Sequence, residues 1–478
     1  MGIDDFIKKY LNKEYIQGQN SNIEIWNTWY KGKSNDFHEY QVYNGENYVK
    51  KDKKSLCMGK KVCADWASLL LSEKTDIVID EKDKIDELFK NIKFWKKANK
   101  AVEQSFALGI GALVVNVKNI SINKKGKLIN NKSGKLNVDF VNGLRVYPIT
   151  VVDGEIIECA FYKYFTGGVN ISIHLIGKDG NYEIHNIVGH GKDDKYEYDN
   201  AMVFNTLSNL PWFKIITPND ANNIDIDDEV GISILANSID ILKTIDDIFD
   251  TFDNEFVQGK KRTFVSARAL KIKVQDGETI RVFDPNDTTF YVLPEDEDGK
   301  NYVNTDNSDL RSEQLIAGLQ KALDLLAFNC GLGTGYYKFE FDGLKTATEV
   351  ITEHSDTFRN IKKHEIILEE VLQDITKVIM YASNTFCGDN FKLEQDIQVK
   401  FDDSIIEDKS AERNMDKLDV NLGVMSKLEY RMKWYAETEE KAKQAIELAL
   451  KEIKEGNDKK DAITAENING NNTKNKNI

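Results

Sequence analysis

The sequence predicts an α+β protein that is mainly helical, with an antiparallel, strand-rich portion and a small α/β insertion. Long segments carry apolar residues at steps of three or four, the spacing of one helix face. Other segments are short β-branched and aromatic runs separated by glycine-containing turns, which is typical of strands. With 478 residues and 41% hydrophobic positions, the chain can bury substantial cores and is expected to form two or three domains.

The first third of the chain predicts helices followed by a meander. Residues 1–50 alternate polar and aromatic positions without a clear period and indicate one short helix. Residues 55–71 and 96–109 have helical spacing. Residues 113–188 change to short strand-like runs broken by turns, and the expected structure is an antiparallel meander.

A helix, a strand-rich insertion and a second helix are expected next. An apolar stripe predicts a helix over residues 228–257, with one face buried. Strand-like runs over residues 260–307 predict the α/β insertion. Residues 308–328 then have helical spacing up to a run of glycines.

The most regular segment is residues 346–384. Thr346 and Glu349 form a capping-box pattern, and the helix predicted after it would be about 58 Å long at 1.5 Å per residue. Shorter helices follow, one of them opening at a second capping-box pattern, Ser426 with Glu429. Beyond residue 456 the chain is rich in Asn and Lys and is predicted to be disordered.

Composition excludes several classes. No run of about 18 apolar residues and no basic-then-apolar leader occurs, so neither a membrane span nor a secretory signal is expected. The five cysteines are scattered and predict reduced thiols. A net charge of −15 with few arginines argues against a protein that grips duplex DNA, because such affinity comes from clustered basic side chains.

Motifs that would carry catalysis or metal binding are incomplete. The glycine run from Gly331 to Gly335 has Tyr336 where a dinucleotide-binding loop needs glycine, so a hinge between helices is favoured. Asp225 and Asp227 resemble the start of an EF-hand, but Val230 stands where glycine is required. The six histidines have no metal-ligand spacing, and Cys330 is interpreted as a packed thiol. No catalytic residue, metal or cofactor is expected, and the chain is not expected to be an enzyme.

Four segments resemble the portal proteins of long-tailed bacteriophages of Gram-positive hosts. They are LCMGKKVCADWASLLLSE (56–73), DNEFVQGKKRTFV (253–265), GLGTGYYKFEFDGLKTATEVITEHSDTFRNIKKH (331–364) and FDDSIIEDKSAERNMDKLDVNLGVMSKLEYRMKWYAETEE (401–440). Their order and spacing also match, and the resemblance covers residues 11–454.

The resemblance implies a phage-portal fold of wing, stem, clip and crown. Its parts would be an N-terminal wing of helices and meander (1–227), a first stem helix (228–258), a clip (259–307), a second stem helix (308–330), a tunnel loop (331–345), a long wing helix with a return strand (346–407), a crown (408–455) and a disordered tail (456–478).

The function implied is that of a ring of twelve copies at one capsid vertex of the virion, the conduit through which double-stranded DNA is packaged and ejected. Its partners would be other copies of itself, the terminase large subunit, head-completion and neck proteins, and the major capsid and scaffolding proteins, with no membrane. The ring would assemble in the host cytoplasm. The acidic balance suits a conduit, in which DNA must slide without deep binding minima.

The same resemblance implies two groups of functional residues. The tunnel loop facing the DNA channel would include Gly331, Gly333, Gly335, Tyr336, Tyr337, Lys338 and Lys345. The clip surface that docks the motor would include Lys260, Lys261 and Arg262. Lys362 and Lys363 are further candidates for transient phosphate contacts beside the loop.

Two other function classes stay open at this point. Another structural minor head protein would share the composition but should lack the order of helix, insertion, helix, glycine run and long helix. A nuclease would need clustered carboxylates for metal ions, and the acids here have no such spacing.

Overall fold

A computed structural model describes residues 1–12, 22–43, 45–72, 74–119, 134–224, 230–259, 309–338, 347–401, 409–435, 441–449 and 451, and five strands between residues 262 and 306. The chain forms two compact units. The first comprises Met1–Gly343 and Glu353–Asp402, and the second comprises Leu344–Thr352 and Asp403–Ile478.

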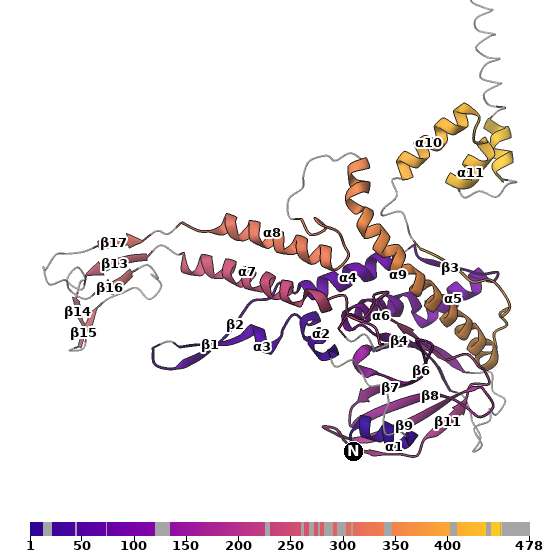
Figure 1. Ribbon diagram of the computed structural model, residues 1–478, viewed down its shortest axis with the longest axis horizontal. Helices are drawn as coiled ribbons and strands as arrows, with labels where there is room; N and C mark the ends of the chain where they lie inside the picture. Colours follow the sequence, from indigo (N-terminus) through magenta and orange to yellow (C-terminus); the bar gives the residue numbers. More distant parts are fainter. Residues whose placement is uncertain are drawn as a thin grey trace, which may run out of the picture. The chain divides into compact units, whose positions relative to one another are not determined.

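Helices and antiparallel sheets both contribute to the first unit, so the α+β class is confirmed (Figure 1). Its helices are α1 (Ile3–Leu11), α2 (Ile23–Tyr30), α3 (Asn35–His38), α4 (Met58–Leu70), α5 (Lys82–Ile92), α6 (Phe94–Leu108), α7 (Ile239–Gln258), α8 (Ser312–Asn329) and the part of α9 (Ala347–Ala382) that begins at Glu353. Its strands are β1 (Glu39–Tyr43), β2 (Tyr48–Asp52), β3 (Asp76–Val78), β4 (Gly111–Lys118), β5 (Lys135–Asn142), β6 (Val146–Val152), β7 (Glu155–Phe165), β8 (Gly168–Ile176), β9 (Tyr182–Lys192), β10 (Lys195–Tyr198), β11 (Met202–Asn205), β12 (Phe213–Ile216), β13 (Arg262–Ser266), β14 (Ile272–Gln275), β15 (Glu278–Arg281), β16 (Phe290–Leu293), β17 (Val303–Asp306) and β18 (Gln398–Lys400).

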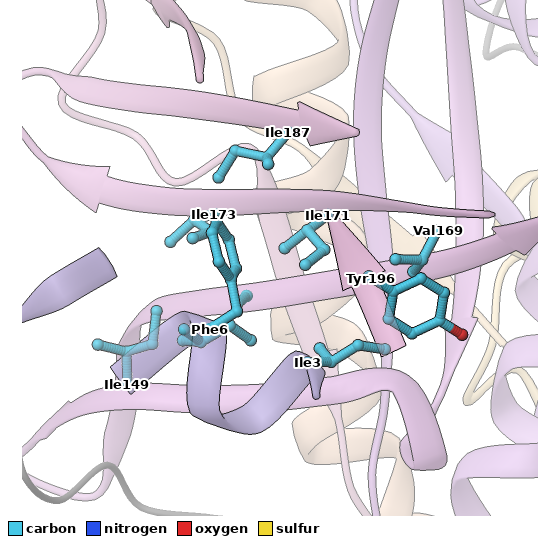
Figure 2. Packing of buried hydrophobic residues seen from close by; sticks show 10 residues of the cluster. Ile3, Phe6, Ile149, Val169, Ile171, Ile173, Ile187 and Tyr196 are labelled. Carbon is cyan, nitrogen blue, oxygen red and sulfur yellow. The ribbon is translucent and has the colours of Figure 1, made fainter. Parts of the chain in front are cut away.

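The largest sheet is the expected antiparallel meander, in which β6, β7, β8 and β9 pair in sequence order. The N-terminal helix α1 lies on one face of it, where Ile3 and Phe6 pack against Ile171 and Ile187 of the strands (Figure 2). Each such buried apolar side chain stabilises the fold by roughly 1.5–3 kcal/mol. The amphipathic α1 therefore closes an apolar core on this face of the meander sheet.

Part of the expected meander belongs to a different sheet, so that prediction was wrong for its first two strands. Strand β5 and most of β4 fall inside the expected range of 113–188, but they belong to a separate sheet, in which β4 pairs with both β5 and β12. Helix α6 packs on that sheet, and burial of Leu113 and Val115 of β4 explains the arrangement, because both are fully covered. The sequence shows the strands, but pairing with β12 depends on a segment a hundred residues away.

The helices expected over residues 228–257 and 308–328 are represented by α7 and α8, which pair with each other. α7 and α8 lie side by side (Figure 1), and a Cβ on Gly318 of α8 would lie 3.9 Å from Ile248 Cδ1 of α7. The regular elements described between these helices are strands, with β13 parallel to β16 and antiparallel to β17, and β14 paired with β15. The strands of the expected insertion are confirmed, and a helix within it stays a prediction.

The expected start of the first of these helices, at residue 228, is wrong. α7 begins at Ile239, after a single 3₁₀ turn. Residues 230–235 instead cover the end of α6, where Ser233 Oγ donates to Ala107 O at 2.6 Å and Ile234 N donates to Phe106 O at 3.1 Å. The apolar residues of this segment, Val230, Ile232, Ile234 and Leu235, are buried although they are not part of α7. Their spacing alone therefore suggested a longer helix than the structure has.

The first fifty residues hold more structure than expected. Besides α1, they form α2, the short α3 and a hairpin of β1 and β2. Trp26 and Trp29 of α2 are buried, which accounts for two of the aromatic residues that showed no period.

The second unit contains α10 (Lys409–Leu422) and α11 (Lys427–Tyr435), and residues 441–449 are also helical. The capping box at the start of α11 is confirmed, because Ser426 N donates to Glu429 Oε2 at 2.9 Å and Glu429 N donates to Ser426 Oγ at 3.1 Å. Asp416 of α10 accepts from Trp434 Nε1 at 2.8 Å and pairs with Lys433 at 2.7 Å. Lys433 holds the pKa of Asp416 below its usual range.

All five cysteines are free, as expected, and burial raises the pKa of the Cys330 thiol to about 11, which confirms a packed thiol. Within the described ranges, no helix is long and apolar enough to cross a membrane. The EF-hand-like residues Asp225 and Asp227, the capping residue Thr346 and the tail after residue 456 lie outside the described residues.

Candidate functional site

The glycine run ends α8 through a tight backbone turn. Gly331 N donates to Phe328 O at 3.1 Å, Leu332 N donates to Ala327 O at 2.8 Å, and Gly331 has a φ of +77°. This is the hydrogen-bond pattern of a glycine-terminated helix. A Cβ on Gly331 would lie 3.1 Å from Asn360 Nδ2, so the position is also tightly packed.

Side chains from α4 and α9 hold the turn in place. Trp66 Nε1 donates to Cys330 O at 2.9 Å, Asn360 Nδ2 donates to Gly331 O at 2.9 Å, and Thr357 Oγ1 donates to Leu332 O at 2.5 Å. Leu332 and Trp66 are almost completely buried. Three successive carbonyls of the loop are thus tied to two different helices.

These contacts change the interpretation of the glycines. We expected Gly331, Gly333 and Gly335 to form a free hinge, but the described start of the loop, residues 330–337, is anchored to the body of the unit. The glycines are needed because their φ angles of +77°, +77° and +81° place three residues in the left-handed region, which is costly for other residues. They set the direction in which the chain leaves α8.

The two tyrosines after the glycines add to the anchor. Tyr337 OH donates to Asp65 Oδ2 at 2.9 Å, and Gln320 Nε2 donates to Tyr337 O at 2.8 Å. Burial raises the pKa of Tyr336 to about 12 and raises the pKa of Tyr337 further, with Asp65 as the second cause. Both phenols are therefore neutral hydrogen-bonding groups at physiological pH.

The basic candidates are placed as follows. Lys338 is exposed at the end of the anchored stretch, and Lys345 lies outside the described residues. Lys363 pairs with Asp220 and Lys362 pairs with Glu365 at 3.0 Å, so both α9 lysines have acidic partners. The structure thus brings the glycines, tyrosines and Lys338 together in one loop.

Two of the three clip candidates lie outside the residues that the structure describes. Lys260 and Lys261 lie outside the described residues, and Arg262 is described only as the first residue of β13. The neighbouring helix ends are joined by Arg311, which makes a two-pronged contact to Glu255 at 2.8 and 3.2 Å. Arg311 holds the pKa of Glu255 below its usual value. This contact closes the base of the insertion between α7 and α8.

A cavity of about 410 Å³ lies beside the loop, lined in part by Asn237, Asn360 and His364. His364 is buried, its ring lies edge-on to Trp66 at 4.8 Å, and Asn219 N donates to its Nδ1 at 3.0 Å. Burial is the main reason that its pKa is lowered to about 4. No group of residues able to hold a metal ion occurs in the described part of the chain.

His364 predicts a pH-dependent stability. Its folded pKa of about 4 lies below the unfolded value of 6.5, so the unfolded chain binds more protons between these values. The free energy of unfolding is therefore highest above pH 6.5 and falls as the pH drops towards 4. The decrease that His364 causes between pH 7 and pH 5 is about 2 kcal/mol. Urea unfolding should show that the free energy of unfolding changes less between pH 7 and pH 5 in His364→Gln than in wild type. The exposed His190→Gln is the control and should behave as wild type, and an unchanged pH dependence in His364→Gln would contradict the assignment.

The anchoring residues Trp66, Thr357 and Asn360 were missed by sequence reasoning. Trp66 was assigned only to the buried stripe of a helix, and the other two are ordinary polar positions on α9. Their role depends on tertiary contacts with a loop, for which no local pattern exists.

A family model described as phage portal protein, SPP1 Gp6-like, matches residues 12–459. The chain belongs to the SPP1 Gp6-like family of phage portal proteins. Its function is accordingly that of a portal protein at a capsid vertex of the virion. The resemblance to portal proteins is confirmed, and the Gram-positive host stays a prediction.

The portal family is structural and not enzymatic. Two solved structures are similar: the neck of a native gene transfer agent particle, computed with C12 symmetry (9% identity, 89% of this chain and 97% of that chain, TM-score 0.44), and a gene transfer agent virion (10% identity, the same coverages, TM-score 0.41). No curated protein matches the chain.

Proposed function

We propose that twelve copies of this portal protein form a ring through which double-stranded DNA enters the head during packaging and leaves it during ejection. The ring assembles in the host cytoplasm, docks the terminase large subunit during packaging, and then binds head-completion and neck proteins. Major capsid and scaffolding proteins would surround it at the vertex.

The order of elements from α7 to α9 is the observation that best supports this proposal. Two antiparallel-packed helices flank a strand insertion, and the second leads through the anchored glycine loop into a helix of 36 residues, about 54 Å long. α7 and α8 would be the stem helices, the strands between them the clip, and the second unit the crown.

The charge of the chain supports a conduit more than a clamp. The net charge is −15, and α7 alone carries six acids and one lysine. Acidic surfaces repel DNA phosphates within about a Debye length, which is near 10 Å at 0.1 M salt, so duplex DNA is not trapped on the wall. Lys338 and Lys345 would provide the few transient contacts at the loop, next to the anchored Tyr336 and Tyr337.

The docking role of the clip is tested by charge reversal. Replacing Lys260, Lys261 and Arg262 together with glutamate should reduce packaged DNA at least tenfold while ring yield stays the same, because the basic surface offered to the motor is removed. The matched control replaces three exposed lysines of the meander sheet region, Lys178, Lys192 and Lys195. Packaging at the wild-type rate in the clip variant would overturn the docking role.

A further inference from the structure

The hairpin of β1 and β2 is exposed on both of its faces. Val42 and Val49 are cross-strand partners that are 37% and 42% exposed, and Tyr43 and Tyr48 are partners that are 57% and 71% exposed. Successive residues of a strand point to opposite faces, so the valine pair and the tyrosine pair lie on different faces. A two-stranded hairpin is marginally stable alone in water, and this one leaves four adjoining apolar side chains uncovered.

The base of the hairpin is held firmly, unlike its tip. Lys53 Nζ pairs with Asp247 at 2.7 Å, Lys54 N donates to Asp250 Oδ1 at 2.9 Å, and Leu56 N donates to Asp246 Oδ1 at 2.8 Å. All three acids belong to α7. From this attachment the strands extend away from α2 and α4 (Figure 1). The hairpin is thus an arm with an anchored base and an uncovered end.

The attachment lies on one side of α7, and α8 lies on the other. Asp246 and Asp250 are four residues apart and share a face, whereas Ile248, which packs towards Gly318 of α8, is about 200° around the helix from Asp246. The arm and α8 therefore occupy opposite flanks of the same helix.

α8 also carries an uncovered apolar patch. Leu325 is 50% exposed and Phe328 is 61% exposed, whereas Leu323 and Leu326 are buried. At 100° per residue, Leu325 and Phe328 lie on the side of α8 away from its buried stripe.

We propose that the β1–β2 arm of one subunit docks on the exposed Leu325 and Phe328 patch of the neighbouring copy of this chain. Because the two surfaces lie on opposite flanks of α7, one copy cannot cover its own patch with its own arm. Contacts of this kind between unlike surfaces run head to tail, and they form a ring where the rotation between neighbouring copies closes. The inference rests on the ring of the proposed function and assigns two of the surfaces that join its subunits.

The direct test places a photo-crosslinking amino acid at Tyr48 in purified rings. Irradiation should join two subunits, with the attached peptide falling between residues 312 and 329 of the second chain. The control places the same group at Tyr164, which is 45% exposed on β7, and should give at least fivefold less of that product. Crosslinks confined to one chain, or directed to another part of the neighbour, would overturn the proposal.

A second measurement follows assembly. The double variant Tyr43→Ser with Tyr48→Ser should form at least fivefold fewer rings than wild type at equal concentration, with an unchanged circular dichroism spectrum. The double variant Tyr164→Ser with Phe165→Ser, at residues 45% and 41% exposed, is the control. If wild type forms rings and the Tyr43 and Tyr48 variant assembles equally well, the docking role of the arm is rejected and the proposed ring still stands. Absence of rings from wild type would reject the ring itself, and the arm with it.

Discussion

Replacing Asp246 with alanine is expected to destabilise the protein by about 3–5 kcal/mol. This carboxylate is 4% exposed and accepts three hydrogen bonds, from His38 Nε2 at 2.9 Å, Ser55 Oγ at 2.9 Å and Leu56 N at 2.8 Å. Ser34 N donates to His38 Nδ1 at 2.9 Å, which leaves Nε2–H as the donor to Asp246. The substitution would leave these buried donors without an acceptor, and chemical denaturation measures the loss.

Asp247 is the matched control, since it is the next residue on the same helix. Its side chain is 52% exposed and its partner is Lys53, so Asp247→Ala should cost less than about 1 kcal/mol. Equal effects from the two alanine variants would contradict the view that Asp246 fastens α7 to residues 34–56.

Replacing Gly333 and Gly335 together with alanine is expected to abolish packaging while rings still form. Their φ angles of +77° and +81° lie in the left-handed region, where alanine costs roughly 1–2 kcal/mol per residue. Leu332, just before them, is fixed through Thr357, so the strain should change the path of the chain that follows. Ring yield and packaged DNA length are the two quantities to measure in assembled heads.

Gly318→Ala is the control for that variant. A Cβ at Gly318 would meet only Ile248 Cδ1 at an ordinary 3.9 Å, and alanine in a helix interior is favoured over glycine by roughly 0.5–1 kcal/mol. This change should stabilise α8 and leave packaging intact. Normal DNA content in heads carrying the Gly333 and Gly335 double variant would show that the loop is only a connector.

Elements with strong local signals could be predicted from the sequence. α9 was expected because its apolar residues repeat over ten turns, and the Ser426 and Glu429 capping box was expected because both partners lie within one helical turn. The strands of the meander were expected because short β-branched and aromatic runs are separated by turn residues. In each case the energy that selects the structure comes from residues close in sequence.

Features set by long-range contacts could not be predicted. The segment before α7 has helical spacing but does not continue that α-helix, and Ser233 in it donates to carbonyls at the end of α6. The glycine loop was expected to be free, because neither Trp66 nor Thr357 reveals in sequence that it donates to a loop carbonyl. The portal function came from the resemblance of whole segments, since no single residue carries it.

The most direct test of the portal function is electron microscopy of the purified chain, combined with light scattering at micromolar concentration. A portal protein should form closed rings with a central channel wide enough for duplex DNA. A stable monomer, or open filaments without a channel, would contradict this function.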